Sequence, residues 1–577
     1  MNRILRAWGE ATAFLRRSRR VTLSDLVVVA ALGGIAFAIG RVGQGWTGAL
    51  RPTVEIDLSP RALPGYALLS LSRGLVAYAF SLLFTLGYGY WAAKDRVAER
   101  VLIPLLDVLQ SVPVLGFMPG LVLALVALFP RSNTGLELAA ILMIFTGQAW
   151  NMTFSFYRSV RSVPNDMTEV ARVYRYTWTE RFRWVELPFS MIGLVWNSMM
   201  SMAGGWFFLM VSEAFVLGDK DFRLPGLGSY MSVAVQRGDH RAMLWAILAM
   251  VAMIVSLDQL LWRPVVVWSE KFRLEEGAGS AQPMSSWFLD VLKRSRLLAA
   301  SGAFLDRIGR GWRARGPTAP PPLHRSGPTS KLVSAALFVG LLAALLFGGL
   351  GLVRLLRVVP GREWAATFGA AVATLGRVLA ATALGTLWAL PAGLAIGLSP
   401  RLSRALQPVV QVVASFPAPM LFPAAIAVLH ALGIGLGVGS VVLMLLGTQW
   451  YILFNVIAGA MAVPQDLREA ARSYRINGFQ LFRELHFPAV LPYLITGWVT
   501  AAGGAWNASI VAEYVSFEGQ RLSTFGLGAQ ITSAADHADF PLLAASVVVM
   551  SAVVVAFNRL VWRPLNDVAE RRFSLQR

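Results

Sequence analysis

Apolar stretches of about twenty residues recur along the whole chain and limit what it can fold into. A helix needs about 20 apolar residues to cross the hydrocarbon core of a bilayer. Twelve such stretches are predicted, near residues 22–42, 66–92, 105–129, 136–158, 189–214, 242–262, 331–356, 367–397, 408–432, 437–460, 490–513 and 541–562. The 577 residues are 56% hydrophobic and only 15% charged, which is too apolar for one soluble core. The sequence therefore predicts an all-α integral membrane protein of about twelve transmembrane helices.

The second half of the chain repeats the first half in register. The corresponding segments are GQAW (147–150) and GTQW (447–450), LWRP (261–264) and VWRP (561–564), and PGLG (225–228) and FGLG (525–528). Chance matches would not share a register over more than a hundred residues, so the offset indicates a duplicated unit. Six spans per copy give both copies the same orientation. The two copies are therefore expected to be parallel repeats, related by an axis along the membrane normal.

The duplication divides the chain into a first transmembrane unit (1–264), a cytoplasmic connector (265–330) and a second transmembrane unit (331–577). The connector ends in a segment rich in proline, glycine and serine, which is typical of an unpacked linker. Its basic, amphipathic part is predicted either to lie on the inner membrane surface or to pack on the cytoplasmic ends of the bundle. Prolines in the third span of each half predict that this span is kinked or partly broken.

The charge of the chain is strongly positive, at a formal +20. Its arginines gather beside apolar runs, where they act as topology signals and contact anionic lipid headgroups. The arginine-rich loops after the second and fourth spans are therefore placed in the cytoplasm, together with both chain ends, and no nucleic-acid partner is expected. The first apolar run lacks a small-residue cleavage site, which favours an uncleaved span over a signal peptide.

Composition also limits the chemistry of the chain. It has no cysteine, and its five histidines show no ligand spacing, so neither a metal site nor thiol chemistry is expected. No stretch matches G-x-x-x-x-G-K-[ST], the phosphate-binding loop of many ATPases. The sequence thus predicts no enzyme and no cofactor in this chain.

Two charged, helix-forming stretches interrupt the apolar pattern between the fourth and fifth spans of each copy. They run from Glu169 to Pro188 and from Glu469 to Pro488, and each follows a Val-Pro pair, opens with Glu-x-Ala-Arg and ends in apolar-x-apolar-Pro. A solvated loop has no reason to keep this length and these positions twice. We expect projecting helices that dock to another protein, with apolar side chains as anchors and charges that set the register.

These stretches resemble a known motif. The spacing Glu469-Ala470-Ala471 with Leu485-x-Phe487-Pro488 is similar to the EAA motif of the permease subunits of binding-protein-dependent ABC importers, and Glu169-Val170-Ala171 with Val185-x-Leu187-Pro188 fits the same pattern. With GGAWNASIVAEY (503–514), the second copy is most similar to permeases of the nitrate, taurine and sulfonate family. The resemblance covers nearly the whole chain as two fused permease units and implies a type I ABC importer-like fold.

The resemblance implies partners and roles. It implies a separate ABC ATPase, expected in two copies and holding ATP and Mg, and a periplasmic solute-binding protein, with the chain in the bacterial inner membrane. Closure of the ATPase pair would push the two docking helices together and open the permease outward to a small solute, an anion such as nitrate, sulfonate or taurine. The residues that the resemblance assigns to ATPase coupling are Glu169, Ala171, Arg172, Tyr174, Pro188, Glu469, Ala470, Ala471, Arg472, Tyr474, Gly478 and Pro488.

The chain departs from the family motif at one position in each copy. Arg175 and Arg475 stand where the motif usually has glycine, six positions after the glutamate. Glycine accepts a positive φ and so permits a sharp turn. Arginine predicts a more continuous helix instead, or, in the second copy, a turn moved to Asn477-Gly478.

The solute pathway is expected between the two copies near the middle of the membrane. Polar and aromatic residues of the fourth and fifth spans are the candidates, because polar groups inside a membrane are costly and so mark function. They are Gln148, Trp150, Asn151, Asn197, Trp206, Glu213, Gln449, Trp450, Asn455, Trp506, Asn507 and Glu513. The alternative reading is structural, since Asn and Gln join helices by hydrogen bonds and Trp marks membrane interfaces.

Four charged residues near the span ends complete the candidates. Glu213 and Glu513 are predicted to face the outer side, where they would contact a binding protein or close an outer gate. Arg73 and Arg377 recur in the second spans. They are expected either to pair with these glutamates or to attract an anionic solute.

The competing function is a secondary transporter, for which two parallel six-helix halves are also a known plan. That mechanism would need coupling carboxylates at midmembrane, whereas the acidic residues here lie near span ends. It also leaves both EAA-like stretches unexplained.

Overall fold

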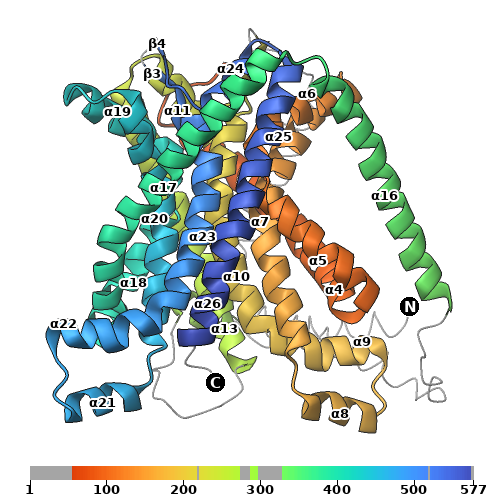
Figure 1. The fold of residues 1–577 in the computed structure, drawn as a ribbon, viewed down its shortest axis with the longest axis vertical. Coiled ribbons are helices and arrows are strands. Elements are labelled where there is room, and N and C mark those ends of the chain that lie inside the picture. Colours follow the sequence, from red (N-terminus) through yellow and green to blue (C-terminus); the bar gives the residue numbers. More distant parts are fainter. Residues whose placement is uncertain (1–54, 218–219, 273–285, 296–327, 518–519, 574–577) are drawn as a thin grey trace, which may run out of the picture.

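The computed structural model describes residues 55–217, 220–272, 286–295, 328–517 and 520–573. These residues form long helices and two short hairpins (Figure 1). Seven helical segments of the described ranges are long and apolar enough to cross a membrane, or up to nine if each of two bent pairs counts as one span. The predicted number of twelve is therefore not confirmed. The first predicted span, 22–42, lies outside the described residues, and α7 (Thr134–Arg161) is not among the seven.

Most elements of the first copy recur in the same order in the second copy. The first copy comprises α3 (Leu63–Phe84), η1 (Thr85–Gly89), α4 (Tyr90–Lys94), α5 (Arg96–Ser111), η2 (Val114–Phe117), α6 (Met118–Leu128), α7, α8 (Asn165–Val173), α9 (Trp178–Arg181), η3 (Phe182–Glu186), α10 (Leu187–Glu213), β1 (Val216–Leu217), β2 (Lys220–Asp221), α11 (Leu227–Gln236), α12 (His240–Leu257), η4 (Asp258–Trp262), α13 (Arg263–Ser269) and η5 (Glu270–Phe272). The second comprises α16 (Pro328–Leu356), α17 (Gly361–Leu398), α18 (Pro400–Ala414), η6 (Ala418–Leu421), α19 (Phe422–Ala431), α20 (Leu436–Met461), α21 (Gln465–Ser473), α22 (Gly478–Leu481), η7 (Phe482–His486), α23 (Phe487–Ala512), β3 (Tyr514–Phe517), β4 (Gln520–Ser523), α24 (Leu527–Asp536), α25 (Phe540–Phe557), η8 (Asn558–Trp562) and α26 (Arg563–Phe573).

The third span of each copy is broken, as its prolines predict. In both copies the two helical parts of this span meet at 84°. Pro113 precedes the 3-10 turn η2, and Pro417 precedes η6. Proline lacks the N–H that a continuing helix would need and clashes with the preceding turn, so the helix ends there and restarts in a new direction.

The broken spans join the copies to each other. The turn η2 of the first copy packs against α23 and α25 of the second, and η6 of the second packs against α10 of the first. The break leaves the backbone N–H of Val114 without a helical acceptor, and it donates to the Asn507 side-chain oxygen of the other copy at 2.9 Å. One continuous apolar core therefore contains residues of both copies.

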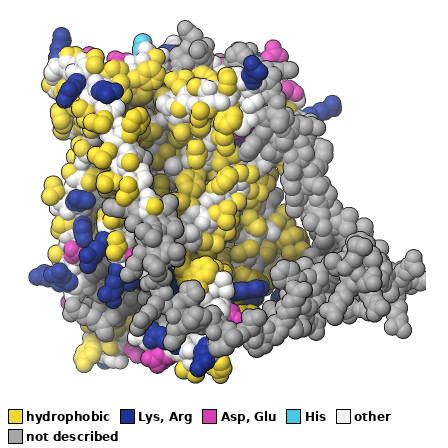
Figure 2. All heavy atoms as spheres, turned by 90° about the vertical axis from the view of Figure 1, so that its right-hand side faces the viewer, with side chains coloured by type: hydrophobic (Ala, Val, Ile, Leu, Met, Phe, Trp, Pro, Cys, Tyr) yellow, Lys and Arg dark blue, Asp and Glu magenta, His cyan; other side chains and the backbone are white. Residues whose placement is uncertain are grey.

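The spans converge at one end of the molecule and the charged loops project from the other. In Figure 1 the short helices α11 and α24 lie at the upper end, and the helix pairs α8–α9 and α21–α22 lie apart at the lower end. Figure 2 shows apolar side chains covering much of the described surface between the upper rim and the lower part, where lysines and arginines gather. This distribution is typical of a multi-pass membrane protein.

A helix crosses the predicted start of the connector at residue 265. The sixth span of the first copy runs without a break from His240 to Phe272, past the predicted boundary at 264. Within the predicted connector the structure also describes one short helix, α14 (Trp287–Arg294), whose first turn is capped by the Ser286 hydroxyl, and the start of α16 at Pro328. The segments 273–285 and 296–327 lie outside the described residues.

The contact between η2 and α25 generates a first prediction. A Cβ added at Gly116 would lie 2.8 Å from a Val547 methyl carbon, whereas at Gly120, in α6, nothing lies within 4 Å. We expect Gly116→Ala to destabilise the protein by about 1–3 kcal/mol, because a packed interface must shift. Gly120→Ala should be neutral or stabilising, because alanine favours the helix. Thermal unfolding in detergent measures both variants, and equal melting temperatures would contradict the close packing.

Candidate functional site

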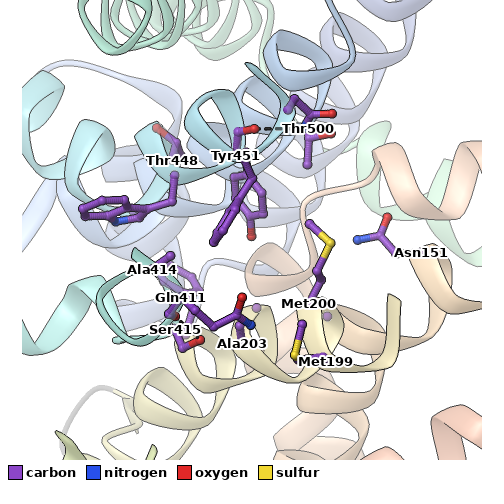
Figure 3. A pocket seen from close by; sticks show the side chains of 18 of the residues that line it. Asn151, Met199, Met200, Ala203, Gln411, Ala414, Ser415, Thr448, Tyr451 and Thr500 are labelled. Atoms are coloured by element: carbon purple, nitrogen blue, oxygen red, sulfur yellow. Dashed lines mark hydrogen bonds between the residues drawn. The ribbon is translucent and has the colours of Figure 1, made fainter. Parts of the chain in front are cut away.

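A cavity of about 760 Å³ lies between the two copies. Its wall includes residues of α7 and α10 from the first copy and of α18, α20 and α23 from the second. In Figure 3, Asn151, Met199 and Met200 of the first copy lie across the cavity from Tyr451 and Gln411 of the second. The fourth and fifth spans thus supply much of the lining, and residues of the third spans and of the first copy's sixth span complete it.

Some of the predicted pathway residues line this cavity. They are Trp150, Asn151, Trp450, Asn455 and Asn507. Two of their amides also make internal bonds: Asn455 donates to the Tyr451 carbonyl at 2.8 Å, and Asn507 donates to the Gly503 carbonyl at 3.3 Å while it accepts from Val114. These asparagines therefore hold the wall in place and border the cavity at the same time.

Other predicted pathway residues are structural. The Asn197 amide donates to the Ser155 hydroxyl and the Gly193 carbonyl, both at 2.9 Å, and so joins α10 to α7. Trp206 is only 2% exposed and Trp506 3%, and both belong to the apolar core. Their large rings contribute much apolar area to this core. The indoles are thus part of helix packing and do not mark a membrane interface.

Two predicted amides lie between helices. Gln148 is buried, and its side-chain oxygen accepts from the Ser81 hydroxyl at 3.3 Å. Gln449 accepts from the Trp388 indole N–H at 3.0 Å. Both therefore join the fourth span to the second in their own copy.

The structure adds cavity residues that the sequence did not single out. They are chiefly uncharged and include Met199, Met200, Gln411, Thr448, Tyr451 and Thr500. The charged residues among the described lining are Asp258 and Arg263, both at the helical segment where α12 passes into α13. The helical spacing of Tyr451 and Asn455, one turn apart on α20, was the signal that could have identified Tyr451.

Arg73 and Glu213 pair with each other, which is one of the two predicted roles of this arginine, and neither residue lines the cavity. Both side chains are buried, and the Arg73 Nη1 lies 2.7 Å from the Glu213 Oε1. The same carboxylate accepts from the Ser70 hydroxyl at 2.8 Å and from the Gly228 N–H at 2.9 Å. Glu213 therefore neither faces the outer side nor forms an exposed gate. A guanidinium that is paired in this way offers little positive potential to a solute.

A second carboxylate completes this cluster in the first copy. The Arg73 Nε and Nη2 lie 2.6 and 2.7 Å from the two oxygens of Glu137, a bidentate geometry that is among the strongest for this pair. Glu137 begins the fourth span. One buried arginine therefore ties together the second, fourth and fifth spans.

The second copy repeats the pair without the extra carboxylate. The Arg377 Nη1 lies 2.8 Å from the Glu513 Oε1, and Thr374 takes the place of Ser70. The Arg377 Nε donates to the Gly437 carbonyl at 3.1 Å. Glu513 is buried, so it too neither forms an exposed gate nor lies on the cavity.

Close packing explains the glycines of the PGLG and FGLG segments. A Cβ on Gly226 or Gly526 would lie 2.3 Å from a carboxylate atom of Glu213 or Glu513, respectively. In each copy the backbone N–H groups at the start of the next helix, α11 or α24, donate to this carboxylate and to a nearby hydroxyl. In the first copy Leu227 donates to the Ser70 hydroxyl at 2.9 Å. The two glycines are therefore needed for the approach of the chain to the buried acid.

The two charged stretches form projecting loops, here called the first EAA loop (163–188) and the second EAA loop (463–488). Each contains two short helices, α8 and α9 in the first loop and α21 and α22 in the second. Among the residues that the resemblance assigns to coupling, Ala171 and Ala471 are buried, while Tyr174 and Tyr474 are 71% and 81% exposed. Pro188 and Pro488 stand in the first turns of α10 and α23. The exposed tyrosines are available to a partner.

The remaining coupling residues lie on the same two loops. Glu169 and Glu469 are exposed, and the Glu469 carboxylate accepts from Gln465 at 2.8 Å. Arg172 and Arg472 stand in the last turns of α8 and α21, and Ala470 precedes the buried Ala471. Gly478, with a φ of 58°, begins α22.

The turn of each EAA loop lies at the arginine itself, so the predicted continuous helix is wrong. Arg175 has a φ of 53° and Arg475 a φ of 54°. In the first loop Arg175 and Tyr176 donate to the carbonyls of Arg172 and Ala171 at 3.0 and 2.9 Å, the pattern of a Schellman cap. These hydrogen bonds hold the arginine in the left-handed conformation that glycine would adopt without strain.

The family described as "Binding-protein-dependent transport system inner membrane component" matches residues 85–261 and again residues 382–572. The chain belongs to this family. The two matches coincide with the two copies seen in the fold, so the protein carries two inner membrane components in one chain.

Curated relatives resemble parts of this inner membrane component. A nitrate import permease protein of Synechocystis sp. is 30% identical over 141 residues, which is 24% of this chain and 50% of the relative. A bicarbonate transport system permease protein of the same organism is 29% identical over 148 residues, 26% of this chain and 51% of the relative. The taurine transport system permease protein of Escherichia coli is 28% identical over 186 residues, which is 32% of this chain and 63% of the relative. The chain thus spans about half the length of the first two relatives.

The unequal clusters of the two copies generate a second prediction. Arg73→Met leaves two buried carboxylates, Glu137 and Glu213, without their cation. Arg377→Met leaves one, Glu513, without its cation. Removal of one partner of a buried pair typically costs about 3–5 kcal/mol. We expect Arg73→Met to lower the melting temperature of the detergent-solubilised protein more than Arg377→Met does. Equal losses would show that Glu137 contributes nothing to the cluster.

The strained turn generates a third prediction. Arg475→Gly should stabilise the turn of the second EAA loop by about 1 kcal/mol, because glycine adopts a positive φ without steric cost. Hydrogen exchange of the Arg475 and Ile476 amides should slow about fivefold. Arg483→Gly in η7 is the control, because this position has no positive φ to relieve, and exchange there should speed up. Faster exchange in Arg475→Gly would contradict the strain.

Proposed function

We propose that the chain is the complete permease of an ABC importer, with the cavity between its copies as part of the path of a small solute. The observation that carries the proposal is the pair of EAA loops at one end of the molecule (Figure 1), one from each copy, each with an exposed tyrosine beside a capped turn. A separate ATPase in two copies, with its own ATP and Mg, would dock on these loops. A periplasmic solute-binding protein would deliver the solute at the opposite end, where α11 and α24 lie.

This assignment places the chain in a bacterial inner membrane with the EAA loops and both termini in the cytoplasm. Movement of the two loops toward each other would rock the two copies about their shared core and change the side on which the cavity opens. The cross-copy contacts of η2 and η6 support this mechanism. They give the copies a common pivot at the broken third spans.

The solute would be a small anion such as nitrate, a sulfonate or taurine. The relatives' names include nitrate, bicarbonate and taurine. The cavity supports recognition by neutral donors, because Asn151, Gln411 and Tyr451 lie on it. Arg263 is the cation of its described lining, and Asp258 lies beside it in the same cavity wall. Neutral donors suit a solute that must be released again, since they bind an anion more weakly than paired arginines do.

The fourth prediction tests the function. The double variant Glu169→Ala with Glu469→Ala should lower ATP-driven uptake by roughly tenfold or more, because both docking helices lose a charge that sets their register. Uptake is measured in proteoliposomes that contain the permease, its ATPase and its solute-binding protein. Glu484→Ala is the control, because this exposed glutamate of the second EAA loop is not one of the matched motif positions and accepts from Gln480 within the same loop.

Three results would count against this proposal. They are unchanged uptake in the double variant, the absence of an ATPase from the permease after mild purification, and uptake by the chain alone driven by a proton gradient. The last result would favour the secondary transporter. Unchanged membrane insertion of the double variant, shown by its yield in the membrane fraction, separates a loss of coupling from a loss of folding.

A further inference from the structure

A buried glutamate at the base of the first EAA loop is surrounded by three donors. The Glu186 Oε1 lies 2.6 Å from the Lys94 Nζ and 2.8 Å from the Arg181 Nε, and the Glu186 Oε2 accepts from the Tyr90 hydroxyl at 2.8 Å. The Glu186 side chain is fully buried, whereas Lys94 and Arg181 are about one-third exposed. A buried carboxylate with three partners is held in one geometry, because moving any partner leaves charge unpaired.

This cluster joins two parts of the first copy that are far apart in the sequence. Tyr90 and Lys94 belong to α4, the last turn of the second span. Arg181 ends α9 of the EAA loop, and Glu186 ends η3, where the chain re-enters the membrane. The Tyr90 ring also packs edge-on against Trp178 and Phe182 of the same loop. The cluster therefore fixes the loop directly to the second span.

The second copy loses the charges at this junction. In the second span the copies correspond with an offset of 304, as Arg73 and Arg377 do, and in the EAA loops with an offset of 300. The residues at the four equivalent positions are therefore Leu394, Leu398, Leu481 and His486. Leu394 lies in an apolar core cluster against which Leu398, Phe482 and Phe487 pack. The same junction is thus held by directional ion pairs in one copy and by apolar contact in the other.

These two kinds of junction differ mechanically. Apolar side chains retain their contacts when packed helices slide by small distances, because dispersion and burial have little directional preference. An ion pair with hydrogen bonds does not retain its energy when its atoms separate by an ångström. A displacement of the first EAA loop must therefore carry α4 with it, whereas the second loop can slip against α17.

We propose that Glu186 is a positioning residue that locks the first EAA loop to the second span, so that the first copy moves as one rigid unit while the second copy yields. The contacts of the lock lie within this chain and need no partner protein. Its role in passing an ATP-driven displacement to α4 and α3 rests on the proposed function.

The first test measures the lock in the purified permease without any partner. The chain has no cysteine, so pairs of spin labels can be attached at introduced cysteines. One pair replaces Val97 of α5, three residues beyond Lys94, and Thr179 of α9. The equivalent pair in the second copy replaces Arg401 and Phe479, and all four positions are exposed. We expect a narrow distance distribution in the first copy and a broader one in the second.

Two variants make this measurement decisive. Glu186→Gln should broaden the first-copy distribution, and the matched His486→Gln should leave the second-copy distribution unchanged. If Glu186→Gln fails to fold, a fourfold variant replaces Tyr90, Lys94 and Arg181 by leucine and Glu186 by histidine, the set that already packs in the second copy. It should broaden the first-copy distribution to that of the second copy. Equal widths in the parent protein, or no broadening in the variants, would overturn the lock.

The second test measures transport in proteoliposomes that contain the ATPase and the binding protein. Glu186→Gln should lower the number of solute molecules imported per ATP hydrolysed by about threefold or more, with ATP hydrolysis and ATPase retention preserved. His486→Gln should leave the ratio unchanged. A purely structural role would lower the melting temperature and the yield without changing this ratio, so an unchanged ratio in Glu186→Gln would overturn the positioning role. If no ATPase binds even the parent protein, the proposed function fails, while the label distances still decide whether the lock exists.

Discussion

The arrangement of each copy depends on one buried ion pair. The pair is Arg73 with Glu213 in the first copy and Arg377 with Glu513 in the second. Each pair lies where the second span, the fifth span and the glycine-containing segment before the outer helix meet. Two opposite charges removed from water must stay together, because separating them inside an apolar bundle costs several kcal/mol. The pair therefore fixes one end of each copy. The EAA loops lie at the other end.

Much of this fold could be predicted from the sequence because the duplication gives each motif a partner. The repeat, the broken third span and the positions of the two EAA loops all follow from spacing and from proline chemistry. The sequence left two roles open for Arg73 and Arg377, pairing with the glutamates or attraction of a solute, and it could not decide between them because burial depends on packing. Arg73 and Glu213 are 140 positions apart, and a sequence that shows an arginine near an apolar run cannot tell a paired arginine from one that lines a path. Trp206 was misplaced for the same reason.

The turn at Arg175 and Arg475 shows a different limit of sequence interpretation. Propensity argues against a positive φ at arginine, yet two capping hydrogen bonds in each loop hold it there. Tertiary and capping interactions outweigh a local cost of about 1–2 kcal/mol. In the candidate cavity, the asparagines were recognisable because polar groups are rare at this depth. Met199, Met200 and Thr500 were not, because they are ordinary residues of a membrane helix.

The hydrogen bond between Val114 and Asn507 has a consequence for the synthesis of the chain. The two residues are separated by 393 positions. At about 5–20 residues per second, a ribosome needs roughly 20–80 s to make the intervening segment. During that time the N–H group freed by the break at Pro113 lacks its acceptor within an apolar environment, where an unsatisfied polar group is costly. The first half is therefore an incomplete structure until the second half emerges. Because the two copies are fused in one chain, the Asn507 acceptor is inserted into the same membrane next to the first copy that needs it.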